Sequence, residues 1–104
     1  MSEMVIVYTT FPDMESARKI VRALLEKKLI ACANLREHEA YYWWEGKIEE
    51  GKEVGAILKT KIDNWKAVRE FLQKNHPYST PAIIRLDVDR VNREYLEWLL
   101  DVTG

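Results

Sequence analysis

The chain has 104 residues, 47% hydrophobic and 32% charged, which is typical of one globular domain that we expect to span residues 1–104. Its 16 lysine and arginine residues nearly balance 17 aspartate and glutamate residues, which argues against nucleic acid as the main partner because phosphate binding requires a basic excess. One cysteine, no long apolar stretch and a first segment without a basic signal region predict a cytoplasmic protein that does not enter a membrane.

The first third of the chain predicts a strand, a helix and a second strand. Residues 5–10, VIVYTT, form an apolar run without alternation, which favours a central strand buried on both faces. Pro12 ends this strand and Asp13 is a good N-cap for a helix, which we expect to end near Lys28. The apolar run at residues 29–35, LIACANL, predicts the second strand.

A row of four aromatic residues, YYWW at 41–44, follows a polar passage at 36–40. In a strand, adjacent side chains point to opposite faces, so both faces of this segment require cover. Glu45 and Gly46 predict a two-residue hairpin turn, and the return strand ends in an apolar half at residues 54–60. Gly51 within the return strand favours a bulge or kink, so we expect a long, bent hairpin.

The remaining sequence predicts a helix, a strand and a further helix. Asp63 is expected to cap the first of these helices, and the proline-containing loop HPYSTP follows it. Residues 82–88, AIIRLDV, predict the last strand. Asn92 is expected to cap a C-terminal helix.

The element order predicts an α+β fold of the ferredoxin-like type, β-α-β-β-α-β with an extra C-terminal helix, an antiparallel sheet and two helices on one face. The other face also looks apolar, because the strands lack strict polar alternation. An apolar sheet face together with an aromatic hairpin is too much exposed apolar surface for a monomer. We therefore expect a homo-oligomer, preferably a closed ring, in which the hairpin reaches a neighbouring subunit.

Three functions hosted by this fold lack their required residues here. The loop after the first strand, TTFPDMES, contains neither the arginine of an acylphosphatase-type enzyme nor the two cysteines of a heavy-metal carrier. The strand VGAILKT lacks the aromatic residues of an RNA-recognition domain. The sequence also shows no nucleophile–base pair, no glycine-rich phosphate loop and no metal motif, so we predict that the protein is not an enzyme.

Six collinear motifs resemble one family across nearly the whole chain: VYTTFPD, LIACANL, YYWWEGKIE, EVGAILKT, HPYSTPAII and YLEWL. Together they resemble the CutA divalent-cation-tolerance family, most closely its archaeal and thermophilic members. The resemblance implies a ferredoxin-like subunit in a homotrimer, similar in architecture to the PII nitrogen-signalling proteins. It also implies a link to tolerance of copper and other divalent cations, without a required cofactor.

The resemblance implies a candidate copper ligand at His76. Some family members use a cysteine in the first strand and a His-His pair before PY, and the matching positions here are Thr9, Asn75 and His76. A single imidazole is a poor basis for tight Cu(II) binding, which takes three or four ligands, unless a neighbouring subunit supplies the others. The alternative is a loop histidine hydrogen-bonded beside Pro77 and Tyr78.

Three weaker metal candidates are Cys32, Asp87 and Asp89. Cys32 lies in an apolar strand, where a buried thiol is usually inert. The two aspartates suit Mg²⁺ or Ca²⁺, but Asp89 also precedes the last helix, whose positive end attracts a carboxylate. We interpret His38 as a surface histidine.

Two surfaces follow from the aromatic segment and the loop. The predicted subunit interface comprises Tyr41, Tyr42, Trp43, Trp44, Gly46 and Ile48. A possible cleft between subunits, by analogy with PII trimers, involves Trp44, Lys59, His76 and Tyr78. Acidic residues at the hairpin tip are interpreted as solvated or as intersubunit ion pairs, with weak cation binding as the alternative: Glu45, Glu49 and Glu50.

The sequence therefore predicts a cytoplasmic, non-enzymatic homotrimer with weak divalent-cation binding and a role in copper tolerance. The alternative is a trimeric signalling protein that binds a small anion or nucleotide between subunits, and a third hypothesis is an interaction scaffold. The many charged helix positions also favour high thermal stability.

Overall fold

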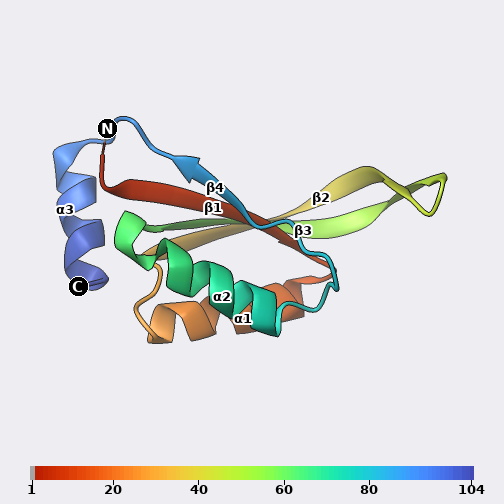
Figure 1. Cartoon of the computed structure of the whole chain (residues 1–104), viewed down its shortest axis with the longest axis horizontal. Coiled ribbons are helices and arrows are strands. Elements are labelled where there is room, and N and C mark those ends of the chain that lie inside the picture. Colours follow the sequence, from red (N-terminus) through yellow and green to blue (C-terminus); the bar gives the residue numbers. More distant parts are fainter. Residues whose placement is uncertain (1) are drawn as a thin grey trace.

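Four antiparallel strands form one sheet in the order β2-β3-β1-β4. The computed structural model describes residues 2–104. Its elements are β1 (Met4–Phe11), α1 (Met14–Glu26), β2 (Cys32–Trp44), β3 (Lys47–Lys61), the 3₁₀ turn η1 (Ile62–Asn64), α2 (Trp65–Asn75), β4 (Ile84–Asp87) and α3 (Arg93–Val102). Helices α1 and α2 cover one face of the sheet, and α3 lies at the end opposite the hairpin tip (Figure 1). This arrangement confirms the ferredoxin-like α+β fold with an extra C-terminal helix.

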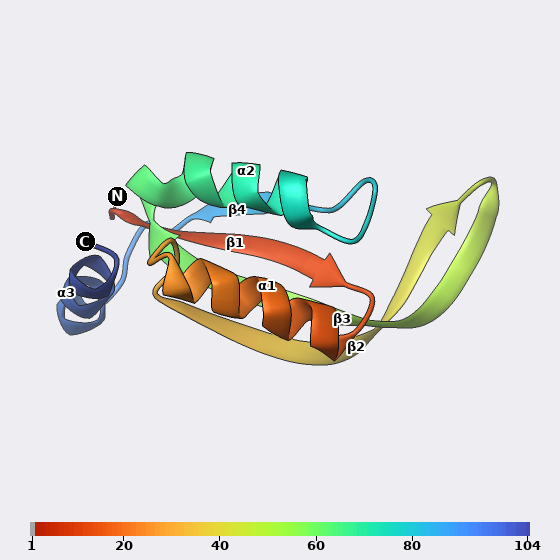
Figure 2. The same cartoon turned by 90° about the horizontal axis from the view of Figure 1, so that it is seen from below.

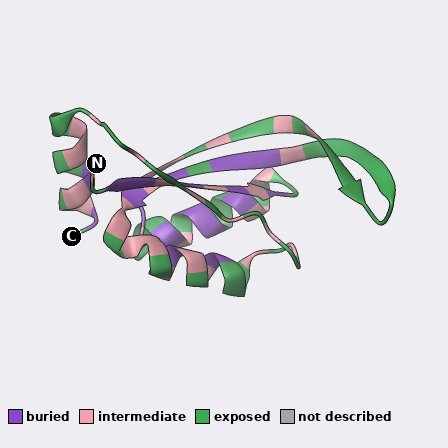
Figure 3. Ribbon diagram, turned by 45° about the horizontal axis from the view of Figure 1, so that its top comes forward, coloured by how far each residue is buried: buried purple, intermediate pink, exposed green. Residues whose placement is uncertain are grey.

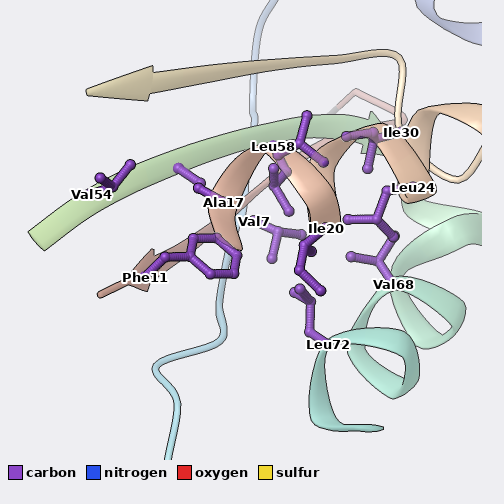
Figure 4. Packing of buried hydrophobic residues seen from close by; sticks show 12 residues of the cluster. Val7, Phe11, Ala17, Ile20, Leu24, Ile30, Val54, Leu58, Val68 and Leu72 are labelled. Atoms are coloured by element: carbon purple, nitrogen blue, oxygen red, sulfur yellow. The ribbon is translucent and has the colours of Figure 1, made fainter. Parts of the chain in front are cut away.

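The hydrophobic core lies between the sheet and helices α1 and α2 (Figure 4). Alternate residues of β1, among them Val7 and Phe11, point into this core and are fully buried. Helical spacing places Leu24 of α1 and Leu72 of α2 opposite them. Because burying one such side chain contributes about 1.5–3 kcal/mol, this single layer supplies most of the hydrophobic stabilisation of the chain.

The other face of the sheet remains apolar and partly exposed, as the sequence predicts. The strand register places Tyr8 between Ile57 and Ile84, and Leu86 beside Ile6, all on this face. Ile57, Ile84 and Leu86 expose 40%, 47% and 52% of their surfaces. The prediction that β1 is buried on both faces is thus wrong for the isolated chain: α1 and α2 lie on the near face in Figure 2, and Figure 1 shows no helix over the middle of the opposite face.

The β2–β3 hairpin is longer and more regular than predicted. Strand β2 begins at Cys32 rather than residue 29, and it includes the polar passage at 36–40. That passage pairs across the hairpin as His38 with Glu53 and Glu39 with Lys52. Polar side chains are accommodated there because the hairpin extends beyond the end of β1 and is largely exposed to solvent (Figure 3).

Gly51 causes no bulge, so that part of the prediction is wrong, but the predicted bend is present, because the hairpin curves away from the rest of the sheet beyond the end of β1 (Figure 2). Gly51 pairs with Ala40, and the register runs without interruption from Cys32–Lys59 to Trp44–Lys47. The turn itself is confirmed: Glu45 and Gly46 have φ values of 48° and 78°, the pair of positive values that a type I′ turn requires.

The helix starts agree with the sequence in part. The Asp13 side chain accepts a hydrogen bond from the Ser16 backbone N–H at 2.8 Å, which confirms it as the N-cap of α1. Asp63 does not cap α2, because residues 62–64 form the turn η1 and Asn64 takes the N-cap position. Asn92 holds the N-cap position of α3, but its side chain makes no capping hydrogen bond.

Asn64 makes no capping hydrogen bond because its side-chain amide is hydrogen-bonded elsewhere. Its amide donates to the carbonyl oxygens of Lys28 and Leu29 and to Thr60 Oγ1, at 3.2–3.3 Å. These bonds fix the connection between α1 and β2, where Lys28 has a φ of 58°.

No helix among residues 2–104 has the length and apolarity needed to cross a membrane.

Candidate functional site

The loop after α2 places His76 against the end of β1. His76 is the C-cap residue of α2, and its backbone N–H donates to the Leu72 carbonyl at 2.9 Å. Its ring stacks on the buried ring of Phe11, with centroids 4.6 Å apart and planes inclined by 6°. The imidazole is therefore held as part of the packing at the edge of the core.

Both ring nitrogens of His76 have partners inside the protein. The Tyr78 backbone N–H donates to Nδ1 at 3.1 Å, and Nε2 lies 3.1 Å from Thr9 Oγ1. Because a backbone N–H can only donate, Nδ1 carries no proton, and Nε2 of the neutral ring is the donor to Thr9. Burial lowers the pKa of His76, against the opposing effect of a backbone hydrogen bond with Thr10, so the neutral form is favoured.

Tyr78 and Glu53 extend these contacts to the hairpin. The Tyr78 hydroxyl donates to Glu53 Oε2 at 3.1 Å, and His38 Nε2 lies 3.2 Å from Glu53 Oε1. Burial, followed by the hydrogen bond and the charge of Glu53, raises the pKa of Tyr78 to about 12. The tyrosine therefore remains a neutral hydrogen-bond donor at physiological pH.

Gly55 allows His38 to lie across the hairpin. A Cβ at this position would lie 3.0 Å from Cε1 of His38 and 3.2 Å from the Tyr8 hydroxyl. A Cβ here would therefore crowd the His38 ring of β2 and the Tyr8 hydroxyl of β1, and glycine avoids both contacts. His38, interpreted from the sequence as a surface histidine, is half-buried, with 31% of its side chain exposed.

Glu53 is the residue of this site that the sequence interpretation missed. A two-residue turn at positions 45 and 46 makes the partner of residue i equal to 91 − i, which pairs His38 with Glu53. The turn was predicted, so the pairing was available from the sequence. The contact between Glu53 and Tyr78 could not be predicted from the sequence, because Tyr78 lies 25 residues further along the chain, in a loop whose path no local pattern specifies.

The other metal candidates are not gathered with His76 into one site among residues 2–104. Cys32 accepts a hydrogen bond from the Tyr95 hydroxyl at 3.7 Å, on the sheet face opposite α1 and α2. Asp87 pairs with Arg85 on the helix-covered face. The Oδ2 atom of Asp89 lies 3.7 Å from Nε of its neighbour Arg90.

Within residues 2–104, no group of three or more His, Cys, Asp or Glu side chains is arranged to hold a metal ion. Since tight Cu(II) or Zn(II) sites take three or four ligands, one copy of this chain does not provide such a site.

The predicted cleft residues are only partly gathered. His76 and Tyr78 are in contact, with ring centroids 5.3 Å apart. Lys59 lies six positions along β3 from Glu53, where its ammonium group is 5.7 Å from the Tyr95 ring centroid. Trp44 is at the hairpin tip, so a cleft that includes all four residues requires a second chain.

The hairpin aromatics alternate as predicted. Tyr41 and Trp43 point to one side of the strand, Tyr42 and Trp44 to the other, and each exposes more than half of its surface, from 52% to 72%. Ile48, the cross-strand partner of Trp43, exposes 64%. Both faces of the hairpin therefore present apolar surface that nothing in the single chain covers.

Known proteins resemble the chain over nearly its whole length. The sequence profile of the family described as CutA1 divalent ion tolerance protein matches residues 5–102. The divalent-cation tolerance protein CutA of Thermococcus kodakarensis is 67% identical over 100 residues, which cover 96% of each chain. The crystal structure of CutA1 from Pyrococcus horikoshii has a TM-score of 0.93 at 64% identity and covers 96% of this chain and 98% of its own.

A more distant relative has the same fold. The structure described as the periplasmic divalent cation tolerance protein CutA from Archaeoglobus fulgidus has a TM-score of 0.94 at 37% identity, covering 97% of this chain and 99% of its own. The sequence motifs, the ferredoxin-like sheet with its aromatic hairpin and these matches agree. This chain belongs to the CutA1 divalent ion tolerance family.

Proposed function

We propose that this protein acts as a homotrimer in tolerance to divalent cations, binding Cu(II) or another divalent cation weakly and catalysing no reaction. The observation that carries the proposal is the uncovered apolar surface on the hairpin and on the second sheet face. A closed ring of three copies covers both surfaces with the same contact repeated. The names of the related proteins support the link to divalent cations.

The geometry of Thr9 and His76 supports the absence of catalysis. A hydroxyl 3.1 Å from an imidazole nitrogen is the spacing of a nucleophile and its general base. However, Nε2 carries the proton when Nδ1 accepts from Tyr78, so it cannot take a proton from Thr9. The pair is a structural hydrogen bond in this arrangement.

The cation is proposed to contact His76, with further ligands from a neighbouring chain. Weak binding is expected because both nitrogens already have partners and because residues 2–104 hold no group of three candidate ligands. The cytoplasmic location remains a sequence-based prediction, and the Archaeoglobus relative is described as periplasmic.

Two measurements test the proposal. Analytical ultracentrifugation at micromolar concentration is expected to give about three times the 12.3 kDa chain mass, and a monomer would contradict the trimer. Calorimetric titration with Cu(II) is expected to show weak binding that His76→Ala reduces. Identical isotherms for the two proteins would remove His76 as a ligand.

The alternative function, binding of a small anion or nucleotide between subunits, predicts a different result. A ligand that binds the native state raises the melting temperature by mass action. A screen in which nucleotides or small anions stabilise the protein and Cu(II) does not would favour the signalling function over metal tolerance.

A further inference from the structure

Two arginine side chains converge on one tryptophan at the start of α2. Trp65 is the first residue of this helix, and Arg69 lies one turn further along the same face. The guanidinium carbons of Arg69 and Arg85 lie 6.0 Å and 5.8 Å from the centroid of the Trp65 ring. We call these three residues the Arg–Trp–Arg cluster, and we propose that it binds a phosphate group whose oxygens accept hydrogen bonds from both arginines.

Strand β4 places Arg85 on the side of the sheet that carries α2. Arg85 pairs across the strands with Val7, whose side chain is buried in the core beneath the helices. Directly paired residues of antiparallel strands share a face, so Arg85 points to the same side. Trp65 packs against the edge of this core. The cluster is therefore built on a helix and a strand, which hold both positive charges beside one ring.

The charges of the two arginines are balanced only in part. Nε of Arg85 donates a hydrogen bond to the Asp87 carboxylate. Among residues 2–104, no carboxylate pairs with Arg69, and its buried Nε has no hydrogen-bond partner. The Arg–Trp–Arg cluster thus has one positive charge more than its paired carboxylate neutralises.

This arrangement is unfavourable unless an anion joins it. Removing a charged group from water is costly when no opposite charge accompanies it, and the two guanidinium groups also repel each other. The face of the Trp65 ring attracts both cations, but it supplies no negative charge. An anion shared by the two arginines would neutralise the excess charge and reduce their repulsion.

The chemistry of the donors favours phosphate. A guanidinium group presents its N–H donors in a planar fork that matches the oxygens of phosphate. Both arginines are partly exposed, and Asp87 occupies only Nε of Arg85, so the terminal N–H groups are available to a ligand from solvent. A tetrahedral phosphate has enough oxygens to accept from both forks at once, whereas a carboxylate has only two.

The phosphate site is separate from the proposed cation contact. His76 follows the last residue of α2, so it lies at the opposite end of the helix from Trp65, roughly 15 Å away along the axis. The inference requires neither a bound cation nor a neighbouring subunit. Its failure would leave the proposed function in place.

Calorimetric titration with inorganic phosphate at constant ionic strength tests the site directly. Arg69→Gln is expected to lower the association constant about tenfold, because hydrogen bonds from a charged donor are lost. Arg22→Gln is the matched control, since it removes the same charge from the exposed side of α1, and it should bind as the wild type does. Equal affinities of the two variants, or no binding by the wild type, would overturn the proposal.

Arg69→Met separates a binding role from a structural one. The substitution keeps an apolar side chain beside Trp65 and removes both the charge and the buried donor without a partner. In phosphate-free buffer we expect the variant to melt at a higher temperature than the wild type. Phosphate should raise the melting temperature of the wild type only. A variant that melts lower and is still stabilised by phosphate would show that Arg69 is structural, against the proposal.

The source of the phosphate group is identified by comparing inorganic phosphate with phenyl phosphate. Higher affinity for the ester, lost in Arg69→Gln, would identify a phosphorylated small molecule whose apolar part contacts the surface beside Trp65. Equal affinity for both, again lost in Arg69→Gln, would identify inorganic phosphate as the ligand. Binding of either compound that Arg69→Gln leaves unchanged would contradict the site.

Discussion

At the scale of single residues, the carboxylate of Glu53 joins three segments of the chain. One oxygen accepts the Tyr78 hydroxyl and the other contacts His38, each within 3.2 Å. Charge-assisted bonds of this kind are stronger than neutral ones and fix both partners in direction. The loop beyond α2 is therefore ordered by a residue of the hairpin rather than by regular structure of its own.

His76 makes the stability of the protein depend on pH. Burial lowers its pKa below the usual 6.5, so the unfolded chain binds a proton more readily than the folded one. The stabilisation present above pH 6.5 is therefore lost as the pH falls through the folded-state value.

Guanidinium unfolding at pH 8 and pH 5 measures this effect. The wild type is expected to lose more unfolding free energy between the two pH values than His76→Gln, because the glutamine does not titrate. An equal loss in both proteins would show that His76 does not contribute.

Gly55 is expected to be sensitive to a single methyl group. In Gly55→Ala the added Cβ would meet the His38 ring at 3.0 Å and displace it from Glu53. We expect a loss of about 1–2 kcal/mol in the free energy of unfolding, measured by denaturant melts.

Gly51→Ala is the matched control for this substitution. It lies on the same strand, and a Cβ there meets no atom within 4 Å. Its stability should be unchanged or slightly increased, because alanine restricts the unfolded chain. Equal losses at the two glycines would contradict the close approach of His38.

At the scale of elements, the hairpin turn has one residue in an unfavourable conformation. Glu45 has a φ of 48°, and a glutamate is less suited to this left-handed conformation than asparagine. Glu45→Asn is expected to stabilise the protein by about 0.5 kcal/mol.

Gly46→Ala should act in the opposite direction. Its φ is 78°, and alanine at such an angle costs about 1 kcal/mol. Melting temperatures of the two variants, measured at one protein concentration, test this pair. A destabilised Glu45→Asn would show that the glutamate side chain makes a contact that outweighs its backbone conformation.

The sequence was most informative where structure is local. The turn at Glu45, the cap at Asp13 and the alternation of the four aromatics all depend on neighbouring residues, and each is confirmed. The cap at Asp63 was wrong because a more distant requirement, the bonds from Asn64 to the α1–β2 connection, shifted the helix start.

The candidate site was less predictable for the same physical reason. His76 and Tyr78 were identified because they lie two positions apart in one motif. The contacts of His76 with Thr9 and of Tyr78 with Glu53 depend on how separate segments meet in three dimensions. Local sequence patterns do not show how distant segments contact one another. Glu53 was therefore missed, although its pairing with His38 across the hairpin was predictable.

At the scale of the whole molecule, the proposed trimer depends on the hairpin surface. Trp44→Asp places a charge on an aromatic position that is 54% exposed in the single chain and that we propose to be buried between subunits. We expect the variant to dissociate or to lose thermal stability, as followed by ultracentrifugation and melting.

Copper titration of Trp44→Asp tests which property changes first, the assembly of subunits or the copper affinity. Subunit dissociation should precede any change in the affinity of His76, because Trp44 is the last residue of β2 at the hairpin tip whereas His76 follows α2. A variant that remains trimeric but binds copper differently would place Trp44 in the ligand site instead of the interface.

The positions of the strands in the chain also determine how folding proceeds. The hairpin closes through a two-residue turn, whereas β1 pairs with β4 between Val5 and Asp87, 82 positions apart (87 − 5). The entropy cost of closing a loop grows with its length, so we expect the hairpin to form early and β4 to join the sheet late. In the proposed trimer, the exposed aromatic residues of the hairpin would then meet another copy before the sheet has acquired its last strand, and assembly would compete with the completion of the subunit.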